Sequence, residues 1–272
     1  MWSMLRLLLF ALIATLAPAQ EAWRKPFPAH KIAGNLHYVG TEDLACFLIT
    51  TPEGHILINS GLADSLPLIR DSVNRLGYKL EDVKILLTMQ AHFDHVAALA
   101  EIQKLTGAKM YATEADAPAL EDGGKSDPSI ERNRFDPIRV DRRLKDGEKI
   151  RLGDTELTVH LTPGHSKGSA GYSMSVMEDG KRLRVLIANM GSVVMPLVGN
   201  AKYPQIAEDF ARSFEAQKKF TPDVWVAAHG SQYRMQEKHK AGSFIDPQGY
   251  KQAVERYEKL FLEQLARERG GR

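Results

Sequence analysis

The amino-acid sequence predicts a single α/β domain in which two β-sheets face each other and helices cover their outer sides. The 272 residues are 43% hydrophobic and 26% charged, which is ordinary for a globular chain that buries a core. Strand-rich segments are twice followed by helices, and no repeat, low-complexity tract or linker divides the chain. We therefore expect one domain over residues 20–272.

The first 19 residues have the three-part order of a secretory signal peptide. Arg6 is followed by an apolar run over residues 7–16, and small residues then occupy positions 17–19. The alternative is a membrane anchor, but this run is shorter than the roughly 20 apolar residues that a spanning helix needs. We expect a signal peptide over residues 1–19, cleavage after Ala19, no membrane anchor in the mature chain, and a periplasmic protein.

The charge balance gives no support to a nucleic-acid partner, and the cysteine content excludes an internal disulfide. The 36 Lys and Arg nearly balance the 34 Asp and Glu, and the chain contains no long basic run. A nucleic-acid partner is therefore not expected. Cys46 is the only cysteine, so an internal disulfide is excluded. Its apolar neighbours indicate a buried strand in which Cys acts as a small hydrophobe.

The first half of the chain alternates strand and helix patterns. Short apolar runs separated by Gly34, Gly40 and residues 52–54 indicate consecutive strands joined by tight turns. A period of three and four residues then predicts a helix that ends at Gly77. The predicted strands span residues 32–39, 46–50, 55–59, 83–88 and 109–112, and the predicted helices span residues 62–76, 96–105 and 115–120. Residues 89–95 therefore connect a strand to a helix.

The second half begins with the longest expected loop. Residues 121–140 contain Gly, Pro, Asp and Ser without clear periodicity. Strand patterns return over residues 154–161, 171–176, 183–188 and 224–228. Two helices are marked by apolar residues at helical spacing, the first by Ile206, Phe210 and Phe214 and the second by Tyr250, Val254, Tyr257, Phe261 and Leu265.

Four of the nine histidines stand where predicted strands give way to loops. His92, Asp94 and His95 follow one strand, His165 lies in a turn after another, and His229 closes a third. Imidazole nitrogen and carboxylate oxygen are ligands that zinc binds readily, and a catalytic zinc keeps one position open for water. For any single histidine, an ordinary hydrogen-bonded loop residue is the better interpretation. Together they predict a metal site at one rim of the sandwich.

Residues 90–95, Gln-Ala-His-Phe-Asp-His, resemble the His-x-His-x-Asp-His signature of the metallo-β-lactamase superfamily. The Thr-Pro-Gly-His turn at 162–165 and the later His229 resemble its other metal motifs. The chain is most similar to the third subclass of class B β-lactamases, in which no Cys ligand is used. Residues 84–92 and 122–127 look especially like the GOB-type branch, which also has Gln at the first motif position. The resemblance implies the four-layer αβ/βα sandwich of this fold.

The resemblance also implies the metal ligands. The first site would be held by Gln90, His92 and His165, and the second by Asp94, His95 and His229. Because an amide oxygen is a weaker zinc ligand than imidazole, Gln90 predicts one firmly held zinc in the second site and a weaker one in the first. Residues 189–192 offer no anionic ligand, so water is expected to complete the second site. Ser192 resembles a residue that helps to hold a substrate carboxylate, and a simple turn serine is the alternative.

By resemblance, the protein is a zinc-dependent β-lactamase that uses a zinc-bound hydroxide to attack the β-lactam carbonyl. Asp94 would be the catalytic residue, both a ligand and the group that orients the attacking water. The small-molecule β-lactam would be the only partner of a monomeric enzyme. Lys125 could meet an anionic substrate, and a solvated loop lysine is the alternative.

Two other functions remain open on this scaffold, because fold alone does not fix function. One is another hydrolase, such as an acyl-homoserine lactonase or a thioesterase like glyoxalase II; the lack of a bridging carboxylate after Ala188 disfavours it. The other is a non-catalytic periplasmic zinc-binding protein, in which Gln90 at the first ligand position would be a sign that catalytic activity has been lost. The complete second site disfavours that alternative.

Overall fold

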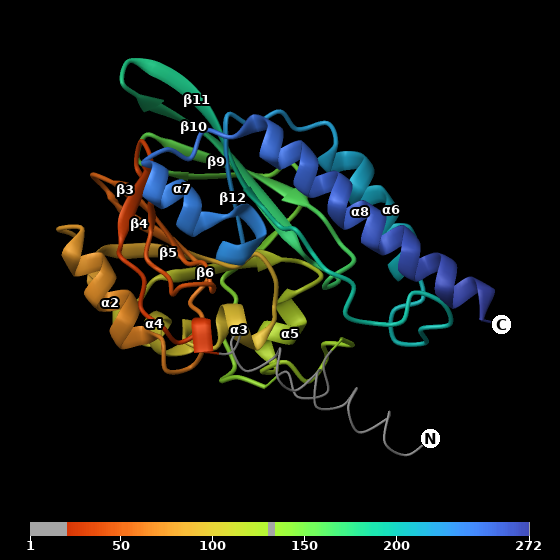
Figure 1. Cartoon of the computed structure of the whole chain (residues 1–272). Helices are drawn as coiled ribbons and strands as arrows, with labels where there is room; N and C mark the ends of the chain where they lie inside the picture. The colour runs from red at the N-terminus through yellow and green to blue at the C-terminus, as the bar shows by residue number, and fades with distance from the viewer. Residues whose placement is uncertain (1–20, 130–133, 272) are drawn as a thin grey trace, which may run out of the picture.

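The computed structural model describes residues 21–129 and 134–271, and the predicted signal peptide lies outside the described residues. Two β-sheets face each other, and helices lie on the outer side of each sheet (Figure 1). The four-layer αβ/βα sandwich predicted from the sequence is therefore confirmed. Within the described ranges, none of the helices combines the length and the apolar character needed to cross a bilayer.

The first sheet contains seven strands in sequence order. Its strands are β1 (His30–Ala33), β2 (Leu36–Tyr38), β3 (Phe47–Thr51), β4 (Gly54–Ile58), β5 (Val83–Leu87), β6 (Lys109–Thr113) and β7 (Arg142–Leu144). Strands β1 to β4 pair antiparallel, and β4 to β7 pair parallel. The predicted strand over residues 32–39 is two strands, because Gly34 turns the chain at a φ of 53° that other residues rarely adopt.

The second sheet has the strand order β12-β11-β10-β9-β8. Its strands are β8 (Lys149–Leu152), β9 (Thr155–Leu161), β10 (Ala170–Glu178), β11 (Lys181–Ala188) and β12 (Val224–Ala227). All neighbours pair antiparallel except β11 and β12, which pair parallel. The sequence did not predict β7 and β8, since each is short and carries only one fully buried side chain.

The helices bury their apolar faces against the two sheets. They are α2 (Leu66–Arg75), α3 (Phe93–Val96), α4 (Leu99–Thr106), α5 (Ala117–Glu121), α6 (Ile206–Gln217), α7 (Met235–Ala241) and α8 (Pro247–Gly270), with 3₁₀ turns η1 (Leu80–Asp82) and η2 (Gly230–Tyr233). Strand β3 shows why both sheet faces are apolar: Phe47 belongs to the core between the sheets, and Leu48 belongs to the core under α2 and α4. Successive residues of a strand point to opposite faces, so a doubly covered strand is apolar throughout.

Helices α6 and α8 lie together along the second sheet (Figure 1). The Phe261 ring on α8 packs 5.5 Å from Phe210 and 5.7 Å from Phe214, measured between ring centroids. Near the end of α8, the Glu268 carboxylate accepts hydrogen bonds from the backbone of Leu197 and Val198, at 2.7 and 2.9 Å. The irregular segment between β11 and α6 is thereby fixed to the C-terminal helix.

Candidate metal centre

The predicted site residues gather where three strands of the two sheets end. Strand β5 leads through Gln90 and His92 into α3, and α3 carries Asp94 and His95. The helix begins at Phe93 and not at Val96 as predicted, so both side chains lie in its single turn. His165 follows β9 in the loop before β10, and His229 follows β12.

Asp94, His95 and His229 form a cage of three donor groups. Their donor atoms all lie within 4.8 Å of one another. Asp94 Oδ2 lies 3.3 Å from His95 Nε2 and 3.6 Å from His229 Nε2. Apart from that approach, the ring nitrogens of the fully buried His95 have no hydrogen-bond partner among the described residues. Because buried polar atoms are normally satisfied, the orphaned nitrogens and the donor types fit a bound zinc ion.

The other three predicted ligands lie beside this cage. The rings of His92 and His165 are 4.7 Å apart between centroids. Gln90 is buried at the end of β5, where its Oε1 accepts a 3.3 Å hydrogen bond from Asn189 Nδ2. Asn189 also donates to the carbonyl of Met89 at 2.8 Å, so it holds the Gln90 segment against the end of β11.

Three of the imidazoles have one ring nitrogen bound to a fixed acceptor. His165 Nδ1 donates to the carbonyl of Ser192 at 2.6 Å, and His229 Nδ1 lies 2.9 Å from Asp43 Oδ2. His92 Nε2 lies 3.2 Å from a carboxylate oxygen of Asp127. Each contact leaves the second ring nitrogen free for a metal, and such contacts fix the orientation of metal-binding histidines.

The electrostatics of the centre favour the ligand forms of Asp94, His95 and His165. Burial disfavours the Asp94 carboxylate, but the neighbouring His95 and His229 outweigh that effect and hold its pKa below the ordinary value. Burial lowers the pKa of His95, and burial together with His92 lowers the pKa of His165 to about 3. A metal needs an ionised carboxylate and neutral imidazoles, and these shifts keep Asp94, His95 and His165 in those forms at neutral pH. The pKa of His92 is shifted the other way: burial lowers it, but the hydrogen bond and the charge of Asp127 outweigh burial and raise it.

Asp116 joins the two loops that carry the candidate ligands, a role that no sequence pattern predicted. Its buried carboxylate accepts hydrogen bonds from Ala91 N at 3.0 Å, Ser166 Oγ at 2.7 Å and Gly168 N at 2.7 Å. Burial raises the pKa of this carboxyl group, and the hydrogen bonds oppose that effect. Asp116 therefore fixes the loop that carries His92 and the loop that carries His165 relative to each other.

The side chains of Ser192 and Lys125 are exposed. Ser192 contacts the centre through its backbone carbonyl, which accepts the hydrogen bond from His165. The backbone of Lys125 donates to Asp122 Oδ1 at 2.8 Å. Contact of either side chain with a substrate stays a prediction.

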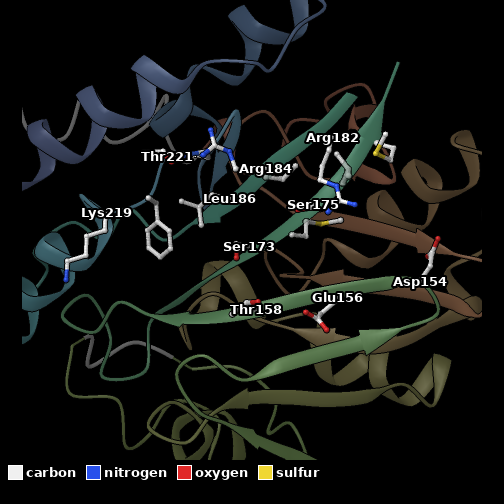
Figure 2. Close-up of a pocket in the computed structure, with 16 residues that line it drawn as sticks. Asp154, Glu156, Thr158, Ser173, Ser175, Arg182, Arg184, Leu186, Lys219 and Thr221 are labelled. Atoms are coloured by element: carbon white, nitrogen blue, oxygen red, sulfur yellow. Dashed lines mark hydrogen bonds between the residues drawn. The ribbon is translucent and has the colours of Figure 1, made fainter. Parts of the chain in front are cut away.

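A groove of about 630 Å³ lies on the outer face of β9, β10 and β11 (Figure 2). It is lined by these strands and by the segment after α6, so it lies apart from the metal centre. Two of its charged side chains are paired, Arg184 with Asp223 and Glu156 with two neighbouring basic residues. Because the groove lies apart from the metal centre, it is not a candidate for the chemistry described above.

The family model of the metallo-β-lactamase superfamily matches residues 40–175. The chain belongs to this superfamily. It resembles solved class B3 enzymes over nearly all of its described length. The metallo-β-lactamase GOB-18 from Elizabethkingia meningoseptica is 41% identical, with 90% of this chain and 95% of that chain covered and a TM-score of 0.87. The class B3 di-zinc metallo-β-lactamase LRA-12 from an Alaskan soil metagenome is 44% identical, with 90% and 96% covered and the same TM-score.

Curated relatives match over shorter stretches. The hydroxyacylglutathione hydrolase of Maricaulis maris is 36% identical over 83 residues, which are 30% of this chain and 26% of that protein. The match thus spans about a quarter of the relative's length. This match agrees with membership of the superfamily and does not extend to the rest of that protein.

Proposed function

We propose that the protein is a zinc-dependent β-lactamase that hydrolyses the amide bond of β-lactam antibiotics. The observation that carries the proposal is the cage of Asp94, His95 and His229, in a chain similar over 90% of its length to solved class B3 enzymes. Bound zinc supplies Lewis acidity and lowers the pKa of water at its open position to about 7.

We assign the six predicted ligands to two adjacent sites. Asp94, His95 and His229 would hold one zinc ion, and Gln90, His92 and His165 would hold the other. The Asp94 carboxylate would also orient the attacking water, because it is the one anionic group of the cage. Ser192, exposed beside His165, would bind the substrate carboxylate. In this largely buried rim each charge acts more strongly than it would in water.

A chromogenic cephalosporin tests the function directly. We expect the purified protein to hydrolyse it, to lose this activity after treatment with a chelator, and to regain it on addition of zinc. Acyl-homoserine lactones and a glutathione thioester serve as comparison substrates. Cleavage of a lactone or of the thioester without cephalosporin turnover would show that the protein is a lactonase or a thioesterase and not a β-lactamase. Inactivity on all of these substrates would favour a non-catalytic zinc-binding protein.

Zinc titration of the metal-free protein is expected to resolve two binding steps of different affinity. The first step fills the cage of Asp94, and the second is weaker because Gln90 offers a neutral amide oxygen. Isothermal calorimetry measures both steps. The Gln90→His variant should tighten the weaker step and leave the tighter one unchanged. Two equally tight equivalents in the unmodified protein would refute the assignment.

Thioester or lactone hydrolysis has weaker support. The first residue after β11 is Asn189, and its amide donates to Gln90 and to the Met89 carbonyl. It therefore supplies no carboxylate to bridge two metal ions. The matches to hydroxyacylglutathione hydrolases also cover less of the chain, 30% for the Maricaulis maris protein and 50% for the Rhodopseudomonas palustris protein, against 90% for the class B3 structures.

We also propose that the chain is exported to the periplasm, with cleavage after Ala19, and acts as a monomer. Trp23 would then lie four residues into the mature chain. Its ring packs 6.0 Å from the ring of His229 and 6.3 Å from that of Phe93, so the start of the mature chain would border the metal centre. N-terminal sequencing of the exported protein tests the cleavage site.

A further inference from the structure

Asp43 contacts the metal centre from a turn between β2 and β3 that is 186 residues from His229 in sequence. Its Oδ2 lies 2.9 Å from His229 Nδ1 and accepts a 3.2 Å hydrogen bond from Trp23 Nε1. Its Oδ1 accepts from the backbone N–H of Ser231 at 2.9 Å. Both carboxylate oxygens are thus used by donors that surround the His229 ring.

The backbone around Asp43 is held independently of its side chain. The Asp43 carbonyl accepts a 2.6 Å hydrogen bond from Gly230 N, and Ala45 N donates to Ala228 O at 3.0 Å. Leu44 and His229 also form an antiparallel β-bridge. These bonds fix the chain on both sides of His229, so a change of the Asp43 side chain acts mainly on the orientation and protonation of the imidazole.

His229 needs such a contact more than the other histidine of the cage. His95 is completely buried, so packing alone restricts its ring. The His229 side chain is 18% exposed at the rim of the site. A neutral imidazole carries its proton on either nitrogen, and the partner of one nitrogen decides which. A carboxylate at Nδ1 keeps the proton there and leaves the lone pair of Nε2 facing Asp94.

We propose that Asp43 is a positioning residue for metal binding: it holds His229 in the Nδ1–H tautomer with Nε2 directed into the cage. This inference rests on the proposed function, in which His229 is a zinc ligand. Carboxylates that orient metal-binding histidines typically contribute 10–100-fold to metal affinity.

The Asp43→Asn variant tests the proposal because it keeps the size of the side chain. An amide has one oxygen, so if Ser231 N–H keeps that oxygen, the amide NH₂ faces His229 Nδ1. The imidazole then accepts at Nδ1 and carries its proton on Nε2, the atom needed for the metal. We expect zinc affinity at the tighter step to fall roughly 10–100-fold.

Asp223→Asn is the matched control. Asp223 precedes β12 at the end opposite His229, and its carboxylate accepts from the backbone and the guanidinium of Arg184. This variant removes the same charge, and zinc affinity should stay unchanged. Circular dichroism of both metal-free variants shows whether the fold is retained.

NMR of ¹⁵N-labelled histidine gives a readout that needs neither metal nor turnover. The metal-free unmodified protein should show the Nδ1–H tautomer for His229, and Asp43→Asn should reverse it. An Nε2–H tautomer in the unmodified protein, or full zinc affinity in a folded Asp43→Asn, would overturn the inference. If the unmodified protein binds no zinc, the proposed function fails instead, so the two failures are distinguishable.

Discussion

Asp94→Ala is expected to lose the tightly bound zinc ion and nearly all turnover. The carboxylate is the one anionic ligand of the cage and lies within 3.6 Å of both imidazoles. Loss of a contact that supports a ligand can lower zinc affinity by roughly 100-fold. Removal of the ligand itself should lower zinc affinity by at least as much. We expect kcat/KM for a chromogenic cephalosporin to fall by about a thousandfold or more. Metal analysis and steady-state kinetics on the same sample measure both effects.

The fold of this variant should survive, because Asp94 contacts only the imidazoles of the centre among the described ion pairs. Thermal unfolding in the presence of chelator should therefore be close to that of the unmodified protein. Asp136→Ala, at an exposed position in the loop before β7, is the matched control and should retain metal and activity. Full turnover by Asp94→Ala would show that the metal centre has been assigned to the wrong residues.

Local patterns in the sequence predicted most of the fold and the position of the centre. Strand ends could be located because apolar runs stop there, and a histidine or aspartate directly after a strand must lie at the edge of a sheet. The start of α3 at Phe93 was missed, since a four-residue helix has no apolar period to detect. Helix α7 was missed for a related reason, because Met235 is its one buried apolar residue near the N-terminal end.

The residues that orient the ligands could not be predicted in this way. Asp43 lies in a Gly-Thr-Glu-Asp turn, where aspartate is common for local reasons alone. Asp127 lies in a loop with no periodicity, and Asp116 begins a short helix. Each acts on a histidine or a loop far away in sequence, so its role appears only after the chain has folded. Metal ligands cluster in motifs, whereas their supporting acceptors do not.

Asp116→Ala should show the largest loss of stability of the variants considered. Asp94→Ala is expected to lose metal binding and keep its fold, whereas Asp116→Ala is expected to weaken the fold itself. Three donors on two loops would lose their common acceptor, namely Ala91 N, Ser166 Oγ and Gly168 N. Ser166 Oγ would keep Ser169 Oγ as a partner, so the loss would fall on the two backbone N–H groups. Each buried unsatisfied donor costs about 1–3 kcal/mol, so the free energy of unfolding should fall by about 2–6 kcal/mol. Urea unfolding in the presence of chelator measures this loss without any contribution from zinc.

Asp116→Asn is the conservative comparison, because its single oxygen can still serve one of the two loops. We expect it to lose less stability than Asp116→Ala and to keep the cage of Asp94, while the weaker zinc step, which needs His92 and His165 together, is impaired. If Asp116→Ala unfolds within about 1 kcal/mol of the unmodified protein, this carboxylate does not hold the loops together. The relative position of the two metal sites would then depend on the packing of the β5 and β9 ends alone.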